Sequence, residues 1–154
     1  MDTSLSKRLF LLILLAGLLP WAYVQTQLSL NGNITWLITA AERMLEGLPM
    51  LENYFEVNPP LSILYNAPPV LLHKILPVPY YYIIIFYFLS LIGLSVWAVY
   101  AISRHWDFLT QDQRLLMLGA FVFSNTIIVT AAIGERDQFI ILGLMPFMMA
   151  QLSM

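Results

Sequence analysis

The sequence predicts an all-α, polytopic membrane protein, and three observations support this class. Hydrophobic residues make up 60% of the 154 residues, whereas charged residues make up 10%. Too few polar side chains remain to cover the surface of a water-soluble domain. Four apolar stretches approach or exceed the length of about 20 residues that crosses a bilayer as a helix. The first three of these stretches contain no charged residue.

The composition also excludes several classes of function. A net charge of −2 offers no basic surface for a nucleic acid, so no nucleic-acid partner is expected. The sequence contains no cysteine, which excludes disulfides, thiolate metal sites and cysteine nucleophiles. With His73 and His105 as its only histidines, the chain cannot build a histidine-rich metal cage.

The four stretches are predicted to be transmembrane helices of one membrane domain, residues 1–154. Residues 9–30, 80–103 and 115–133 form three complete spans, and residues 139–154 form a truncated fourth. A cleaved signal peptide is the alternative for the first stretch. Its apolar region is too long for that role, and Ala22-Tyr23-Val24 is a poor cleavage site for lack of small residues.

Basic residues near the span ends predict the orientation. Lys7 and Arg8 precede the first span, and Arg104 and Arg114 flank the loop between the second and third spans. Placing both groups inside puts the N-terminus in the cytoplasm. The outer loop, residues 31–79, and the short turn at residues 134–138 then lie together on the outer side.

The outer loop is predicted to carry two helices that lie along the membrane surface. Apolar residues recur in the first helix at spacings of three and four: Ile34, Leu37, Ile38, Ala41 and Leu45. Glu42, Arg43 and Glu46 lie off this stripe and are expected on its solvated side, and Gly47 with Pro49 ends the helix. Residues 61–76 form the second amphipathic element, which Pro68-Pro69 is expected to break.

Two acidic groups are predicted to meet on the outer side. Glu56 lies just before the rigid pair Pro59-Pro60, and Glu135-Arg136-Asp137 lies in the turn between the third and fourth spans. A partly desolvated carboxylate can act as a general base, and an arginine beside it can hold a phosphate through two hydrogen bonds. The groups therefore suit a lipid-phosphate substrate. The alternative is that the charged turn is a solvated cap and Glu56 an ordinary loop residue.

Other polar residues are interpreted structurally. Tyr80-Tyr81-Tyr82 fits a belt of aromatic residues at the membrane interface. Asn125 and Thr126 are interpreted as polar groups that pack helices together, and His73 as a structural residue.

The order of these motifs resembles the N-terminal part of the GT-C superfamily of membrane glycosyltransferases, on the protein-mannosyltransferase and aminoarabinose-transferase side. The resemblance rests on the outer helix NITWLITAAERMLEG, the loop FEVNPPLS, the segment APPVLL and the run GERDQFIILGLMPFM. It covers essentially the whole chain. Such enzymes run to several hundred residues, with many more spans.

Some residues match the family and others depart from it. Glu56 matches the acid of the family's Asn-Pro-Pro-Leu motif, and Arg136 matches the arginine of a later Arg-Glu-His-type motif. Asp137 and Gln138 stand where Glu and His are usual. Asn33 stands where the family carries a catalytic Asp, and an amide cannot take a proton. The resemblance thus implies Glu56 as the catalytic residue. It implies a substrate-binding set: Asn33, Asn58, Glu135, Arg136 and Asp137.

The resemblance implies transfer of a sugar from a polyprenyl-phosphate donor to an acceptor on the outer side of a bacterial inner membrane, with inversion. It does not specify the sugar, the acceptor or any need for a divalent cation. Because much of the family's donor cavity lies in later spans, we expect the chain alone to be inactive. The alternative is a small non-catalytic membrane subunit that packs against a larger membrane partner. A small transporter is disfavoured, because the three complete spans carry no charge.

Overall fold

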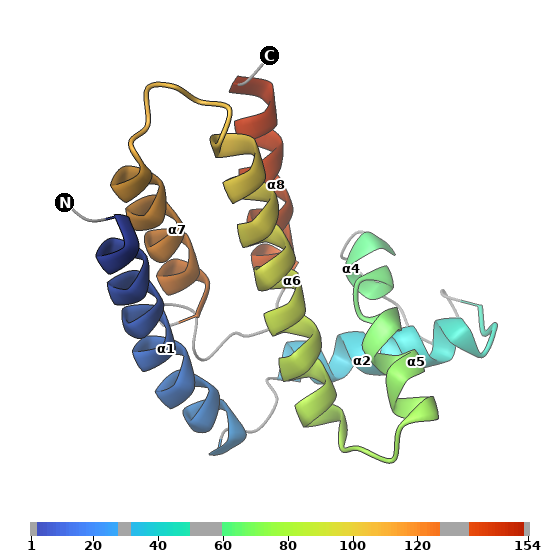
Figure 1. Ribbon diagram of the computed structural model, residues 1–154. Coiled ribbons are helices and arrows are strands. Elements are labelled where there is room, and N and C mark those ends of the chain that lie inside the picture. Colours follow the sequence, from blue (N-terminus) through green and yellow to red (C-terminus); the bar gives the residue numbers. More distant parts are fainter. Residues whose placement is uncertain (1–2, 28–31, 50–59, 127–135, 153–154) are drawn as a thin grey trace.

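The computed structural model describes residues 3–27, 32–49, 60–126 and 136–152, and the regular elements within these ranges are all α-helices. This confirms the predicted all-α class. The helices form two regions (Figure 1). The bundle consists of α1 (Thr3–Gln27), α6 (Tyr80–Ser103), α7 (Gln111–Thr126) and α8 (Arg136–Leu152). The end layer consists of α2 (Gly32–Leu45), α4 (Pro60–Leu64) and α5 (Ala67–Ile75).

Helix α6 is the central element, since it packs against α8, α7 and α1 in the bundle and against α5 in the end layer. Its 24 residues span about 36 Å. In the described part of the chain, α6 is the one helix that is both long and apolar enough to cross a membrane. Helices α1 and α8 contain shorter apolar stretches, Phe10–Val24 and Gln138–Leu152.

Helix α6 has the predicted bounds, whereas α1, α7 and α8 begin earlier than the predicted spans. Helix α7 begins at Gln111 because Thr110 and Gln113 form a capping box: the Gln113 N–H donates to Thr110 Oγ1 at 3.3 Å, and the Thr110 N–H donates to Gln113 Oε1 at 2.9 Å. Helix α8 begins at Arg136, so the turn predicted for residues 134–138 is wrong for its last three residues. Residues 28–30, 127–133 and 153–154 of the predicted spans lie outside the described residues.

The core of the bundle combines apolar side chains from all four helices. The half of this core that lies nearer the end layer contains these buried residues: Trp21, Ile85, Phe88, Ile92, Phe121, Val122, Phe139 and Leu142. Its other end is closed by Val99, Leu118 and Met149, against which Phe10 packs. The buried Ser95 hydroxyl donates to the Leu142 carbonyl at 2.6 Å and ties α6 to α8.

The end layer has a separate core. The apolar stripe of α2 is buried at Ile34, Leu37, Ile38 and Ala41 and packs against Ile63 of α4, Val70 of α5 and Ile84 of α6. This confirms the predicted stripe except at Leu45, which is exposed. Helix α2 ends at Leu45, and the predicted stop signal, Gly47, follows it with a φ of 76° in the left-handed region. The Gly47 N–H donates to the Met44 carbonyl at 3.0 Å and the Leu48 N–H donates to the Arg43 carbonyl at 3.1 Å, which is a Schellman motif.

The second element is broken as predicted, but just before its two prolines rather than at them. The chain turns earlier, at Tyr65 and Asn66, and Pro68 and Pro69 lie in the first turn of α5. A proline there costs nothing, because the N–H groups of the first turn have no partner within the helix. The Asn66 side chain, which is buried, donates to the Ser62 carbonyl at 2.9 Å and holds α4 to the start of α5.

The outer surface of the bundle is apolar. Large hydrophobic side chains point outward from each of its four helices, among them Leu19 on α1, Phe86 on α6, Leu116 on α7 and Phe147 on α8. In water such a surface would be a site of association. The bundle therefore presents to its surroundings the kind of surface that the hydrocarbon layer of a membrane solvates.

Candidate functional site

The predicted site residues lie at three places along the chain. Glu56, Asn58 and Glu135 lie outside the described residues. Arg136 and Asp137 are the first two residues of α8, of which the structure describes the backbone. Asn33 is exposed in the first turn of α2. The structure therefore tests the surroundings of the predicted site rather than its side chains.

Helix α4 begins within the motif that contains Glu56 and Asn58. Pro60, the second proline of that motif, is the first residue of α4, where its fixed φ favours the helix. Leu61 follows it in the same turn and is exposed. The motif therefore leads into a short helix whose position the structure describes.

The end of α4 contacts the start of α8. The Tyr65 ring, just after α4, stacks on the Phe139 ring with centroids 5.0 Å apart and planes at 7°. Phe139 also meets Phe88 of α6 edge-on, with centroids 5.7 Å apart. Phe139 lies three residues after Arg136, which is about 4.5 Å along α8. Segments that flank the two acidic groups thus meet beside α6.

The start of α8 is set back from the start of α6. Phe139 packs against Phe88, which lies eight residues, or about 12 Å, after the first residue of α6. Phe139 lies three residues, or about 4.5 Å, after the start of α8, so about the first one and a half turns of α6 continue past the start of α8, towards the end layer (Figure 1). Arg136 and Asp137 begin a helix at this recessed level.

Buried polar side chains join the end of α7 to the start of α8. Gln138, which is 2% exposed, donates from Nε2 to the Asn125 carbonyl at 3.2 Å. The buried Asn125 donates from Nδ2 to the Phe121 carbonyl at 2.9 Å, and Thr126 donates to the Val122 carbonyl at 2.8 Å. Asn125 and Thr126 are thus buried polar groups of a helix junction, in line with their predicted role. Among the described residues, Asn125 Oδ1 finds no hydrogen-bond donor.

A second polar cluster was missed at the sequence level. Glu42 of α2 is half-buried, and its Oε1 accepts a hydrogen bond from the Tyr80 hydroxyl at the start of α6. The His73 ring of α5 lies against the Tyr80 ring, with centroids 3.7 Å apart and planes at 31°. Helices α2, α5 and α6 therefore meet at the side chains of Glu42, His73 and Tyr80.

The tautomer of His73 follows from its partner. Its Nδ1 lies 2.8 Å from the Val78 carbonyl oxygen, which can only accept, so Nδ1 carries the proton. In the neutral ring, Nε2 is then the acceptor. The contacts of His73 hold α5 against the start of α6, which agrees with its predicted structural role.

The position of Glu42 corrects the sequence-level interpretation. Glu42 was expected on the solvated side of α2 with Arg43 and Glu46. It is half-buried instead because it follows Ile34 and Ile38 at intervals of four and therefore borders the apolar stripe. That register was the one signal in the sequence that could have indicated its burial.

Among the described residues, no group of three or more His, Asp or Glu side chains lies close enough to hold a metal ion. What they offer is a hydrogen-bonded carboxylate and the recessed start of α8. Comparison of the chain with models of protein families, with curated proteins and with solved structures finds no match.

Proposed function

We propose that the chain is the N-terminal part of a membrane glycosyltransferase of the GT-C type, embedded in a bacterial inner membrane through α1, α6, α7 and α8. The apolar outer surface of the bundle supports this placement. Exposed side chains such as Leu12, Leu94, Leu116 and Phe147 would each cost free energy in water and none in lipid. The amphipathic α2, with Trp36 exposed, then lies along the membrane surface.

The stacking of Tyr65 on Phe139 carries the proposal of a shared site. The residues that follow Glu56 and Asn58 form α4, and the residues that follow Glu135 form α8. Because these two helices meet beside α6, we expect Glu56 and the Glu135–Asp137 group to lie near one another. That is the arrangement a base and a phosphate-binding arginine require.

The proposed reaction transfers a sugar from a polyprenyl phosphate. The oxygen of an acceptor hydroxyl attacks the anomeric carbon, while the bond between that carbon and the phosphate oxygen breaks. The proton of the hydroxyl passes to the Glu56 carboxylate, and the polyprenyl phosphate leaves with the electron pair. Arg136 neutralises the phosphate. Asn33, Asn58, Glu135 and Asp137 contact the substrates, and the configuration at the anomeric carbon is inverted.

Cysteine pairing tests the shared site sharply, because the chain has no cysteine of its own. In E56C/R136C, mild oxidation should form an intramolecular disulfide, since bonding needs Cα atoms within about 7 Å. The matched control E56C/R104C places the second thiol at the far end of α6 and should stay reduced. A membrane-impermeant maleimide should reach Cys at 56 and at 136 from the same side.

The maleimide experiment also distinguishes a glycosyltransferase from a non-catalytic membrane subunit. If the maleimide reaches the two positions from opposite sides, the sugar-transfer proposal fails, and a non-catalytic membrane subunit remains. Incubation of the purified chain with labelled polyprenyl-phosphate sugar should yield no product, and turnover by the chain alone would contradict its assignment as an incomplete enzyme.

A further inference from the structure

Helix α8 contains a proline in its interior, Pro146. Because proline has no N–H group, the carbonyl of the residue four positions earlier, Leu142, loses its partner within the helix. The proline ring also clashes with that carbonyl in a straight helix. Gly143 lies within the same turn, and glycine and proline are the poorest helix formers. Residues 142–146 are therefore the weakest part of the backbone of α8.

The neighbouring helix supplies the donor that Pro146 lacks. Ser95 of α6, which is 6% exposed, donates its hydroxyl proton to the Leu142 carbonyl at 2.6 Å. A serine hydroxyl has a single proton, so this bond uses its whole capacity as a donor. A carbonyl without a donor among apolar helices is costly, and serine side chains of neighbouring helices can satisfy one that a proline has freed.

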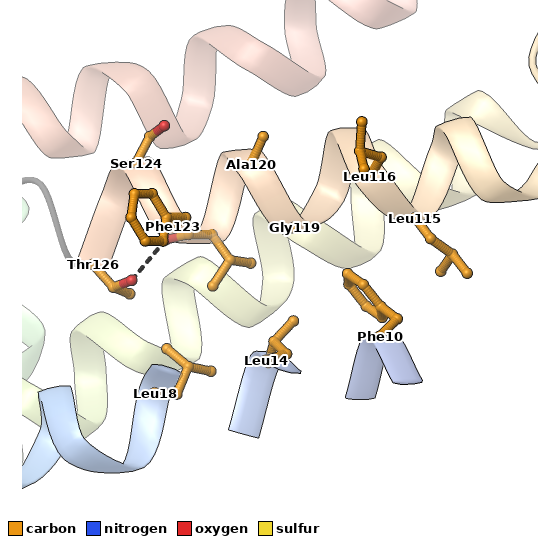
Figure 2. A pocket seen from close by; sticks show the side chains of 11 residues that line it. Phe10, Leu14, Leu18, Leu115, Leu116, Gly119, Ala120, Phe123, Ser124 and Thr126 are labelled. Carbon is orange, nitrogen blue, oxygen red and sulfur yellow. Dashed lines mark hydrogen bonds between the residues drawn. The ribbon is translucent and has the colours of Figure 1, made fainter. Parts of the chain in front are cut away.

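The bond made by Ser95 differs from the bonds that such hydroxyls usually make. A serine or threonine within a helix commonly donates to the carbonyl four residues earlier in its own helix. Thr126 of α7 does so at 2.8 Å, at one end of an apolar groove of about 430 Å³ between α1 and α7 (Figure 2). Ser90 of α6 does so at 2.8 Å as well. Ser95 instead donates across to α8, to the carbonyl that Pro146 leaves without a partner.

Helix α8 is attached to the bundle on both sides of its weak turn. Before this turn, Phe139 meets the ring of Phe88 edge-on. After it, Met149 is buried against Val99 of α6. The bond from Ser95 lies between these two contacts, at the point where the backbone of α8 is least able to hold its own direction.

We propose that Ser95 is a positioning residue that closes a hinge in α8 at residues 142–146. By closing the hinge it sets the direction of the segment between Leu142 and Arg136, which is six residues or about 9 Å long. The role of Arg136 in phosphate binding rests on the proposed function, whereas the hinge and its closure by Ser95 do not. The two proposals can therefore fail separately.

Distances across the hinge test this role, since a chain without cysteine can be labelled at chosen positions. Nitroxides at I140C and F147C, two exposed positions of α8, lie about 10.5 Å apart along the helix axis. In S95A the distribution of this distance, measured by electron paramagnetic resonance, should widen about twofold, because nothing holds the hinge. The matched control S90A removes a hydroxyl that bonds within α6 and should leave the distribution unchanged.

Further variants test whether the hydroxyl replaces the missing N–H group. In S95A/P146A the new N–H of residue 146 can reach the Leu142 carbonyl, so the distribution should return to its original width. S95T should keep the original width, whereas S95V, which has the same shape without a hydroxyl, should be as wide as S95A. Equal widths in S95A and S90A, or no recovery in S95A/P146A, would overturn the inference. If S95A misfolds, equal widths in S95T and S95V would overturn it.

Disulfide formation in E56C/R136C tests the consequence for Arg136. Adding S95A should slow this reaction at least about threefold, because the bond needs a specific geometry, and adding S90A should not. If E56C/R136C forms no disulfide while S95A still widens the distance across the hinge, the shared site fails and the hinge stands. If S95A widens that distance but leaves the rate of disulfide formation unchanged, Ser95 does not position Arg136 and the inference is overturned.

Discussion

The bundle and the end layer differ in how apolar residues are distributed around their helices. The end layer buries one stripe of an amphipathic helix, with Ile34 and Ala41 inside and Trp36 outside. The helices of the bundle carry apolar residues on all sides, so that Phe88 is fully buried while Phe86, two residues away, is 69% exposed. Phenylalanines two positions apart on α6 therefore differ in burial according to the helices around them, whereas in α2 the sequence pattern itself separates the buried side from the exposed side.

The largest effect is expected in the core of the bundle. Phe88→Ala should lower the free energy of unfolding by about 3–5 kcal/mol, because it removes a fully buried ring that packs on Phe139. Denaturation by SDS in mixed micelles measures this change. Phe86→Ala is the matched control on the exposed side of α6 and should cost less than about 1 kcal/mol. Equal losses in the two variants would mean that the bundle does not pack as described.

The same substitution, Leu→Asp, made once in each region tests whether that region is surrounded by lipid or by water. Leu94→Asp, in the exposed middle of α6, should disfavour membrane insertion by about 3 kcal/mol, because a charge at the centre of a bilayer is costly. Leu61→Asp, at an exposed position of α4, should change insertion little. The inserted fraction in microsomal membranes measures both. A similar tolerance at the two positions would remove the distinction between a lipid-facing bundle and a water-facing layer.

The junction between the two regions depends on Glu42 and Tyr80. Tyr80→Phe should cost about 1.5 kcal/mol of stability, because a half-buried carboxylate loses its donor. Tyr82→Phe, at an exposed neighbour, should be neutral. A double-mutant cycle with Glu42→Gln isolates the pair, and a coupling energy near zero would show that the hydrogen bond does not tie α2 to α6.

The smallest effect is expected to change sign between the regions. Gly47→Ala should cost about 1 kcal/mol, because φ at this position is 76° and a Cβ atom disfavours the left-handed region. Gly93→Ala should be neutral or stabilise by up to about 1 kcal/mol, because it lies within α6 and an added Cβ atom meets nothing within 4 Å. Thermal unfolding in detergent measures both, and destabilisation by Gly93→Ala would indicate a neighbour against that face.

Sequence reasoning predicted the local features that depend on nearby residues. The stripe of α2 and its end at Gly47 were correct, since periodicity and a glycine after the last turn are local signals. The break in the second element was predicted two to three residues too late, at Pro68 and Pro69, because a proline pair can end a helix or begin one, and here it begins α5. For the candidate site, the sequence named Glu56 and Arg136 but could not indicate the contact of Tyr65 with Phe139, which joins residues far apart in the chain.

The sequence by itself determined the helical class, the apolar character of the bundle and the buried side of α2, because composition and periodicity encode these directly. The tertiary structure decided which side of α6 faces its neighbours, that Glu42 meets Tyr80, and that a groove lies between α1 and α7. The physical reason is that a helix apolar all round has no preferred side until other helices surround it. Complementary shape, as where Phe10 meets Gly119, then selects the arrangement.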